Sequence, residues 1–421
     1  MNNTTDISPS MMITTRPISH VGSKDFWLAL CVSLPSLIRV ICPSGIESLL
    51  FEVSIADIPF YWPNLLLIFF ITNAKLYKGS RIIKLLLFIQ LIAVFLGVLL
   101  NRYNHTLAFL LSGNYYFYAF FIGISFSISE GQRYWISRFF SICVILLSLE
   151  VLLYSSGILT SYQGTELTTD FEDYGGIERI STTAGAATST ACDLYLMIVL
   201  CMMTTNNKKR RLFVFAIGFV ALLLTVSRGG IFAMFFYLAF SIIDRMKNTR
   251  HKSKIVVTTI VALGVIYYVG LFNPFLDRLQ VKNESSDMSS GREALAAMTL
   301  NNYYQNADVL ALGLGFANVY PSTEIQHAGY IPTWPGAPHN MYVLTLAEQG
   351  WLGLLLTVWI ILIILFSVRK NKTLLISLIP VFLILYNTET VIGVNCQELF
   401  IVMIILSISL DKKHTYLVNK W

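Results

Sequence analysis

Long apolar runs, separated by short polar segments, follow one another along almost the whole chain. About 20 apolar residues in a helix cross the hydrocarbon core of a bilayer. The runs 211–226 and 229–244 are separated only by Ser227-Arg228-Gly229, which we interpret as a tight turn because a charge at mid-membrane is costly. The pattern predicts an all-α, polytopic membrane helix bundle of about 12 transmembrane helices. The predicted spans are 26–42, 58–74, 82–100, 107–128, 135–155, 187–205, 211–226, 229–244, 255–272, 340–367, 373–390 and 396–411.

Two connections between predicted spans, 156–186 and 273–338, are long enough to hold more than a turn. Long connections often carry a lid or a functional site. In the second one, Ser290 and Glu293 have the spacing of a capping box, so we expect a helix from there to about Tyr304. The predicted organisation is a tail at 1–25, helices one to nine within 26–272, a long periplasmic loop at 273–338, helices ten to twelve within 339–411, and a tail at 412–421.

Composition and charge support this topology. The chain has 55% hydrophobic and 13% charged residues, whereas a soluble domain carries roughly 25% charged residues. If the N-terminus is cytoplasmic, most of the 30 lysines and arginines lie in cytoplasmic segments, as the positive-inside rule requires. We therefore predict a multi-pass protein of the cell membrane with both termini cytoplasmic. The net charge of +6 then reflects contact with anionic membrane lipid and requires no nucleic acid.

Three of the few basic residues left on the outer side lie at abrupt junctions of the chain. Arg179 ends the first long loop, Arg228 lies in the predicted turn, and Arg292 lies in the first turn of the predicted loop helix. The planar guanidinium group binds a diphosphate through two parallel hydrogen bonds and keeps its charge. These arginines could therefore hold a lipid diphosphate, or they could reach lipid headgroups or pair with acids such as Asp193. Asp193 could equally be a polar contact between helices.

His339 lies where the long loop re-enters the membrane, directly before Asn340. Imidazole accepts a proton near neutral pH, which suits the activation of a sugar hydroxyl. A helix cap or a packing residue is the alternative, and His327 in the same loop is a weaker candidate. Glu348 follows His339 by nine residues and would lie on the opposite face of a continuous helix, which argues against a His–Glu dyad.

Several motifs of energy-coupled or metal-dependent enzymes do not occur in the sequence. It contains no Walker loop, no dinucleotide-binding glycine pattern, no HExxH motif and no outer Asp-x-Asp pair. A reaction at this site would need no metal and no cofactor, and its donor would arrive already activated. A lipid-linked diphosphate sugar is such a donor.

Two segments resemble motifs of one bacterial family. His339-Asn340, followed nine residues later by Gly350-Trp351-Leu352-Gly353-Leu354, resembles the His-Asn-x9-Gly-x-x-Gly-Leu pattern of the O-antigen ligase/polymerase superfamily. Thr225-Val226-Ser227-Arg228-Gly229-Gly230 resembles its Ser-Arg-Gly turn.

Two further segments extend this resemblance. Gly291-Arg292, followed by Leu312-Gly313-Leu314-Gly315-Phe316, resembles the Gly-Arg…Gly-x-Gly-x-Phe block of the long periplasmic loop. Arg179 before Gly185-Ala186-Ala187-Thr188 resembles the Arg…Gly-x-Ala-Thr stretch. The resemblance covers roughly residues 175–365 in consistent order, and residues before 150 match only in hydropathy.

The resemblance implies a metal-independent glycosyltransferase of the bacterial inner membrane. Its essential histidine and arginines correspond to His339, Arg228 and Arg292, and Arg179, Asn340, Tyr342 and Asp193 are predicted to bind or orient substrate. The expected partners are an undecaprenyl-diphosphate-linked glycan and a saccharide acceptor, either lipid A–core or a growing glycan.

Four functions remain open from the sequence. The first is an O-antigen ligase that joins the glycan to lipid A–core, and the second is a polymerase that extends it on its lipid. An O-linked protein glycosyltransferase of the same superfamily is less favoured, because the large C-terminal domain often found there does not occur. A transporter or flippase is less favoured because the two halves of the chain show no repeat and the polar residues concentrate on one face.

Overall fold

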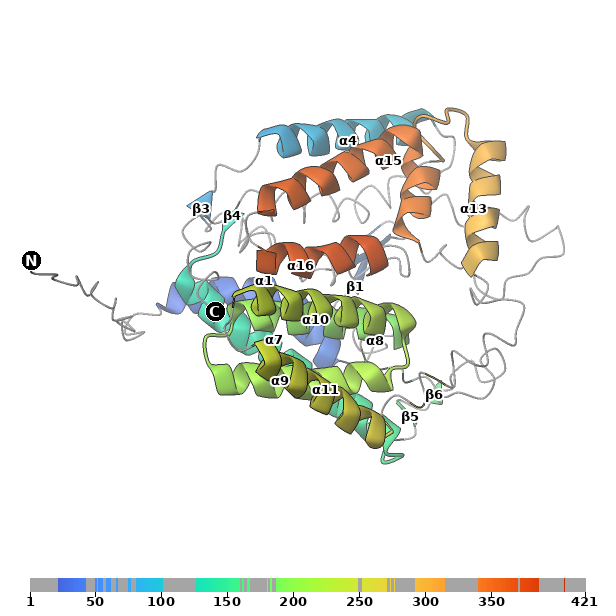
Figure 1. The fold of residues 1–421 in the computed structure, drawn as a ribbon. Helices are drawn as coiled ribbons and strands as arrows, with labels where there is room; N and C mark the ends of the chain where they lie inside the picture. Colours follow the sequence, from blue (N-terminus) through green and yellow to red (C-terminus); the bar gives the residue numbers. More distant parts are fainter. Residues whose placement is uncertain are drawn as a thin grey trace, which may run out of the picture.

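The computed structural model is dominated by helices (Figure 1). The residues it describes are 22–42, 50, 52–55, 58–61, 66, 75–76, 81–100, 126–159, 161–162, 165–166, 180, 182–183, 187–248, 252–270, 273, 276, 292–314, 340–369, 372–385 and 405. The described helices are α1 (Ser23–Ile41), α4 (Arg81–Leu100), α7 (Glu130–Ser155), α8 (Ala187–Thr204), α9 (Lys208–Leu224), α10 (Arg228–Asn248), α11 (Lys252–Tyr268), α13 (Arg292–Asn306), α15 (Met341–Val368), α16 (Lys372–Pro380) and the π-helix η2 (Val381–Leu385).

Four of these helices are long and apolar enough to cross a membrane. They cover Glu130–Ser155, Ala187–Thr204, Arg228–Lys247 and Met341–Phe366. The predicted helical membrane protein is therefore confirmed in outline, and the count of about twelve spans stays a prediction. Most residues of the predicted spans 58–74, 107–128 and 396–411 lie outside the described residues.

Three short antiparallel pairs of strands accompany the helices. The pairs are β1 (Glu52–Ile55) with β2 (Ile58–Tyr61), β3 (Lys75–Leu76) with β4 (Phe126–Ser127), and β5 (Ser161–Tyr162) with β6 (Thr165–Glu166). The prediction of a helix from residue 58 is wrong at its start, because β2 pairs there with β1 from Ile55↔Ile58 to Glu52↔Tyr61. Both strands are rich in β-branched and aromatic residues, which favour extended backbone. The predicted end of the span 107–128 is likewise a strand, β4.

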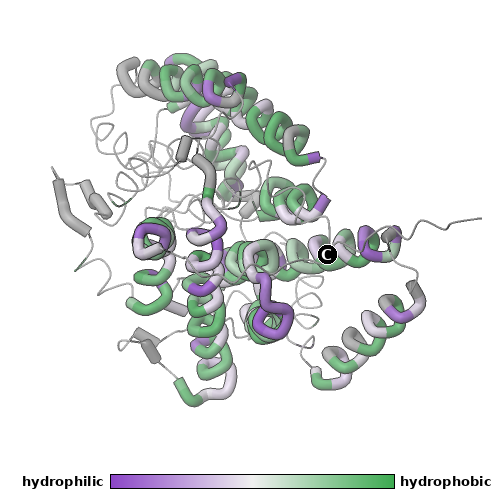
Figure 2. The backbone as a smooth tube through the Cα atoms, turned by 90° about the vertical axis from the view of Figure 1, so that its left-hand side faces the viewer, coloured by the Kyte–Doolittle hydropathy of each residue, from purple (hydrophilic) through white to green (hydrophobic). Residues whose placement is uncertain are grey.

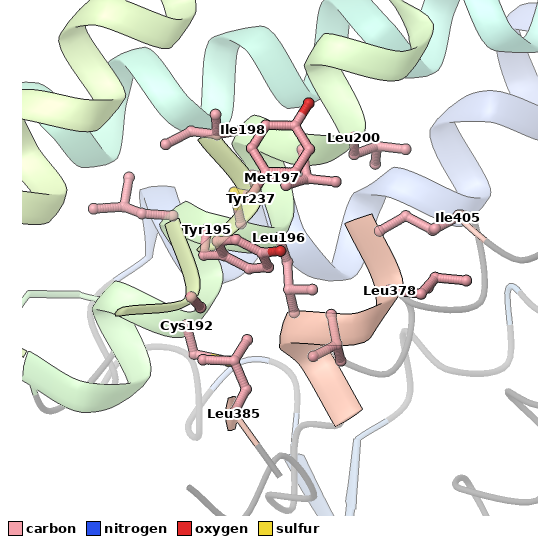
Figure 3. Close-up of a cluster of buried hydrophobic side chains, with 14 of the residues drawn as sticks. Cys192, Tyr195, Leu196, Met197, Ile198, Leu200, Tyr237, Leu378, Leu385 and Ile405 are labelled. Carbon is pink, nitrogen blue, oxygen red and sulfur yellow. The ribbon is translucent and has the colours of Figure 1, made fainter. Parts of the chain in front are cut away.

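The core of the molecule surrounds α8. This helix packs on α7, α9 and α10, and all of its residues from Thr190 to Cys201 are buried. Figure 3 shows the apolar side chains of α8 facing Tyr237 of α10 on one side and Leu378 and Leu385 of the α16–η2 segment on another. The Tyr195 hydroxyl donates a hydrogen bond to the carbonyl oxygen of Ser377 (3.1 Å) and so joins α8 to α16. The central helix α8 therefore sets the positions of α7, α9, α10 and α16 around it.

A second group of helices contains α4 and α15, and α16 lies between the two groups (Figure 1). The fully buried Gln90 side chain of α4 joins it to α15. Its Nε2 donates to Gln349 Oε1 and to Thr357 Oγ1, each at 2.8 Å. A polar group among apolar helices is stabilised only when it finds such partners.

The predicted span 340–367 is one chain segment but not one straight helix. Gly350 has φ 67° and ψ −170° inside α15, a conformation that is open essentially only to glycine. The part of α15 before Gly350 therefore turns away from the direction of the second part, and Figure 1 shows the first part lying beside α13. Gly353, one turn later, leaves room for the Gln349 side chain that reaches Gln90.

Basic residues gather at one end of the helices. Lys372 at the start of α16 pairs with Asp244 near the end of α10 (Nζ–Oδ1 3.4 Å). Arg210 at the start of α9 donates to Ser137 Oγ near the start of α7 (2.6 Å). In Figure 2, where this end faces the viewer, hydrophilic residues lie mainly at helix ends and the helix bodies are hydrophobic. This distribution agrees with the predicted cytoplasmic side, and the orientation itself stays a prediction.

Candidate functional site

The turn between α9 and α10 places Arg228 at the start of a helix. Ser227 N–H donates to Thr225 Oγ1 (3.3 Å), Val226 has φ 53°, and Ile231 N–H donates to the Ser227 carbonyl oxygen (3.0 Å). The prediction of two helices joined by a tight turn is therefore confirmed. Arg228 is the first residue of α10 instead of part of the connection, and its side chain is half-buried.

An arginine at this position is unfavourable for the helix alone. The N-terminus of a helix carries a partial positive charge, so a cation there costs about 0.3–1 kcal/mol where a carboxylate would stabilise. Arg292 occupies the same position in α13, a helix whose last turn has no basic residue. Residues that go against a local preference, here the preference of helix starts for acidic side chains, are expected mainly at functional sites. An anion bound between such helix starts would be attracted by the guanidinium groups and by the free backbone N–H groups together.

The start of α10 is pressed against α8. A Cβ atom added at Gly230 would lie 2.7 Å from Ala191 Cβ and 3.2 Å from the Ala191 carbonyl oxygen. Glycine and alanine therefore let the two backbones approach closely, which brings the turn containing Arg228 beside α8. Asp193 lies two residues further along α8 and is fully buried. Its pairing with an arginine stays a prediction.

The segment that follows Arg179 is attached to α7. The Thr183 backbone N–H and hydroxyl donate to the two carboxylate oxygens of Glu150, at 2.7 and 2.8 Å. The Thr182 and Thr190 hydroxyls, 2.8 Å apart, join the same segment to α8. Glu150 is an acid near the end of an apolar run, where an acid is expected to face a cavity or a partner, and Thr183 is that partner. Arg179 itself lies outside the described residues.

Asn340 begins α15. Its side-chain oxygen accepts hydrogen bonds from the backbone N–H groups of Tyr342 (2.9 Å) and Val343 (3.1 Å), which is the geometry of an N-cap. This oxygen therefore has a structural role. The predicted contact of Asn340 with substrate is not tested and stays a prediction. His339 and the Arg292 side chain lie outside the described residues, so their approach to Arg228 is not tested.

Tyr342 connects α15 to the π-helix. Its hydroxyl donates to the carbonyl oxygen of Phe382 (2.6 Å) in η2, so the side chain is a bridge between the two elements. We expect Tyr342→Phe to lower the free energy of unfolding by about 1 kcal/mol, the net value of one hydrogen bond. Thermal unfolding of the purified protein measures this loss. Tyr268→Phe is the matched control, since Tyr268 on α11 is 91% exposed.

An unchanged melting temperature combined with a raised KM for substrate would contradict the bridging role. That outcome would favour the substrate-binding role predicted from the sequence.

The helix starts that carry the candidate residues lie on the same side of the molecule. Figure 1 shows α10, α13 and α15 all beginning on its right-hand side, opposite the basic helix ends. Among the described residues, no group of three or more His, Cys, Asp or Glu side chains could hold a metal ion. Metal independence stays a prediction.

Comparison with protein-family models matches residues 213–358 to the family described as O-Antigen ligase. No curated protein matches the chain. The matched region extends from α9 into the second part of α15, and so includes Arg228, Arg292 and His339. The match confirms the resemblance over residues 213–358, and the stretch from Arg179 to Thr188 lies outside it.

Proposed function

From the O-antigen ligase family domain at residues 213–358, we propose that this protein transfers a lipid-linked glycan to an acceptor sugar. The donor is an undecaprenyl-diphosphate-linked glycan, and the reaction takes place at the periplasmic face of the bacterial inner membrane. The observation that carries the proposal is the position of Arg228 and Arg292, each the first residue of a helix within the family domain.

The donor diphosphate binds between the starts of α10 and α13. Arg228 and Arg292 contact its oxygens, and the backbone N–H groups of the first helical turns add further donors. These groups stabilise the charge that builds up on the diphosphate as it leaves, which is the step where they lower the barrier. Arg179 adds a third guanidinium group beside the diphosphate, and Asp193 pairs with one of the arginines and orients it.

His339 acts on the acceptor. The acceptor hydroxyl oxygen forms a bond to the anomeric carbon, the bond from that carbon to the diphosphate oxygen breaks, and the configuration inverts. A sugar hydroxyl is far less acidic than an imidazolium group, so His339 takes the proton late, once the bond to the diphosphate is largely broken. Asn340 holds the start of α15 in place, and this fixes the backbone next to His339.

The acceptor that we favour is lipid A–core, which makes the protein an O-antigen ligase. A polymerase that extends the glycan on its lipid uses the same donor chemistry and is the second candidate. Transport of the lipid-linked glycan is a third and weaker candidate, because the family domain belongs to transferases.

The test is transfer by the purified full-length protein in detergent, without an ion gradient. The substrates are undecaprenyl-diphosphate-linked glycan and lipid A–core, and products are separated by gel electrophoresis. Glycan joined to lipid A–core supports the ligase, and longer glycan on the undecaprenyl lipid supports the polymerase. Absence of any new glycosidic bond, with the protein folded and monodisperse, would overturn the transferase proposal.

A deletion strain separates the two transferases independently. Loss of a ligase leaves bare core together with long lipid-linked polymer. Loss of a polymerase leaves core capped with a single repeat unit.

A further inference from the structure

The segment after α13 is attached to α15 where that helix is broken. Trp351 N–H donates to the Leu310 carbonyl oxygen (3.2 Å), and Leu352 N–H donates to that of Ala311 (3.1 Å). In the other direction, Leu314 N–H donates to the Ala347 carbonyl oxygen (2.8 Å). The break at Gly350 frees these groups from the ladder of α15, and residues 310–314 satisfy them. We call residues 310–314 and 347–352 together the joint.

Two glycines on opposite sides of the joint allow this contact. Gly313 has φ 76°, and a Cβ atom added to it would lie 2.5 Å from Gly350 N and 2.6 Å from the Glu348 carbonyl oxygen. A Cβ atom added to Gly350 would collide with the backbone of Leu310 and Ala311. Each glycine is thus required by the backbone of the other segment, which explains why the two glycine patterns singled out in the sequence occur together.

Tyr303 ties the joint to the body of α13. Its side chain is fully buried, and its hydroxyl donates to the same Leu310 carbonyl oxygen that accepts from Trp351 N–H. A tyrosine hydroxyl is protonated at neutral pH and can therefore donate, and burial raises the pKa of Tyr303 further. One carbonyl oxygen therefore connects a side chain of α13 with the backbone of the second part of α15.

The joint fixes the relative position of two helix starts. From it, α13 extends back to Arg292, and the first part of α15 extends back to Asn340, while the two helices lie side by side (Figure 1). Helices as short as α13 and the first part of α15 behave as rigid rods. A shift or a rotation at the joint would therefore be transmitted to their starts. Gln90 of α4 holds both parts of α15 at the break, because it donates to Gln349 before Gly350 and to Thr357 after it.

We propose that the joint, and Tyr303 in particular, positions Arg292 relative to His339 for glycan transfer. This inference rests on the proposed function. Tyr303 is a positioning residue that acts through Arg292 and contacts no substrate. A misplaced Arg292 weakens the stabilisation of the leaving diphosphate, whereas binding of the donor, which also involves Arg228, changes little.

The experiment is a double-mutant cycle on the purified full-length protein. Tyr303→Phe removes only the hydroxyl, and we expect kcat to fall about three- to tenfold while KM for the lipid-linked donor stays within about twofold. In an Arg292→Lys background, the same substitution should cost less than about twofold, because residues that act through one another are not additive. Gly313→Ala removes no functional group, but its Cβ atom would meet the backbone of Glu348 and Gly350, so it should lower both the melting temperature and kcat.

Tyr304→Phe is the matched control, because Tyr304 is the next residue of α13 and is 52% exposed. It should leave kcat and KM unchanged. Effects of Tyr303→Phe and Arg292→Lys that multiply fully would overturn the positioning role, as would equal effects of Tyr303→Phe and Tyr304→Phe. Wild-type protein that forms no glycosidic bond would instead refute the proposed function, so the two failures are distinguishable.

Discussion

Replacing Arg228 with alanine is expected to lower glycan transfer about 10³-fold, the upper end of what one preorganised charge-stabilising group contributes. The side chain is half-buried at the first position of α10, where the helix start adds its own positive potential. A diphosphate at this place is stabilised most strongly when its charge is greatest, which is as the bond to the sugar breaks. The loss should therefore appear in kcat more than in KM.

Lysine at position 228 should recover only part of the rate. It keeps the charge but presents a point charge on a flexible stem, and it cannot bind two phosphate oxygens through a planar fork. The melting temperature of Arg228→Ala without donor is measured together with the rate, so that a loss of stability is separated from a loss of catalysis.

Arg245→Ala is the matched control for Arg228→Ala. Arg245 lies in the last turn of the same helix and is exposed at the basic end of the molecule. The rate of transfer is measured with equal amounts of monodisperse protein and saturating acceptor. Wild-type turnover by Arg228→Ala would refute a role in catalysis, and a loss of the same size in Arg245→Ala would assign the effect to net charge.

The apolar runs predicted the middles of the helices correctly, because these are apolar. They predicted the starts of the helices less accurately. The predicted span at 135–155 corresponds to α7, which begins five residues earlier, at Glu130. Ser129 accepts from Gln132 N–H, and the Gln132 side chain accepts from Ser129 N–H, each at 3.1 Å. A capping box of polar residues thus begins the helix where an apolar scale sees only a connection. The start of α9 is missed for the same reason, since it is basic and is capped by Asn207.

The break in α15 could not be predicted from the apolar run at 340–367. A single backbone angle at Gly350 leaves average hydropathy unchanged, and the hydrogen bonds that stabilise the break come from residues 310–314. The link between Glu150 and Thr183 is hidden in the same way, because it joins residues 33 positions apart. Contacts of this kind depend on tertiary packing, which local patterns do not encode.

The places of two candidate arginines along the chain could be predicted from the sequence, and their roles stay predictions. The tight turn placed Arg228 at a helix end, and the capping-box spacing placed Arg292 in the first turn of a loop helix, where α13 begins. The sequence could not indicate that the side chain of Asn340 caps α15 or that the Tyr342 hydroxyl is engaged by η2. The same side chain can form a hydrogen bond within the protein or to a substrate. Only its partner in the folded structure shows which of the two it does.

Replacing Gly350 with alanine is expected to lower the free energy of unfolding by about 2–6 kcal/mol. Forcing a non-glycine residue into the conformation of Gly350 costs about 1–3 kcal/mol, and overpacking against a fixed backbone costs about 1–3 kcal/mol more. The Cβ atom would meet the backbone of residues 310–311, which cannot move aside as a flexible side chain could. The alternative, in which α15 straightens, breaks the three backbone hydrogen bonds of the joint and releases the segment after α13.

Both responses move the start of α13 away from that of α15, so we expect glycan transfer to be lost with the stability. Thermal unfolding in detergent measures the first effect, and transfer per folded molecule measures the second. Gly264→Ala is the matched control, because an added Cβ atom there meets nothing within 4 Å and the backbone of α11 is regular. Alanine is the better helix former by about 1 kcal/mol, so this control should be neutral or slightly stabilising. A Gly350→Ala protein with the wild-type melting temperature and transfer rate would show that the break in α15 is not needed. A similar loss of stability and transfer in Gly264→Ala would point to a general effect of replacing helix glycines.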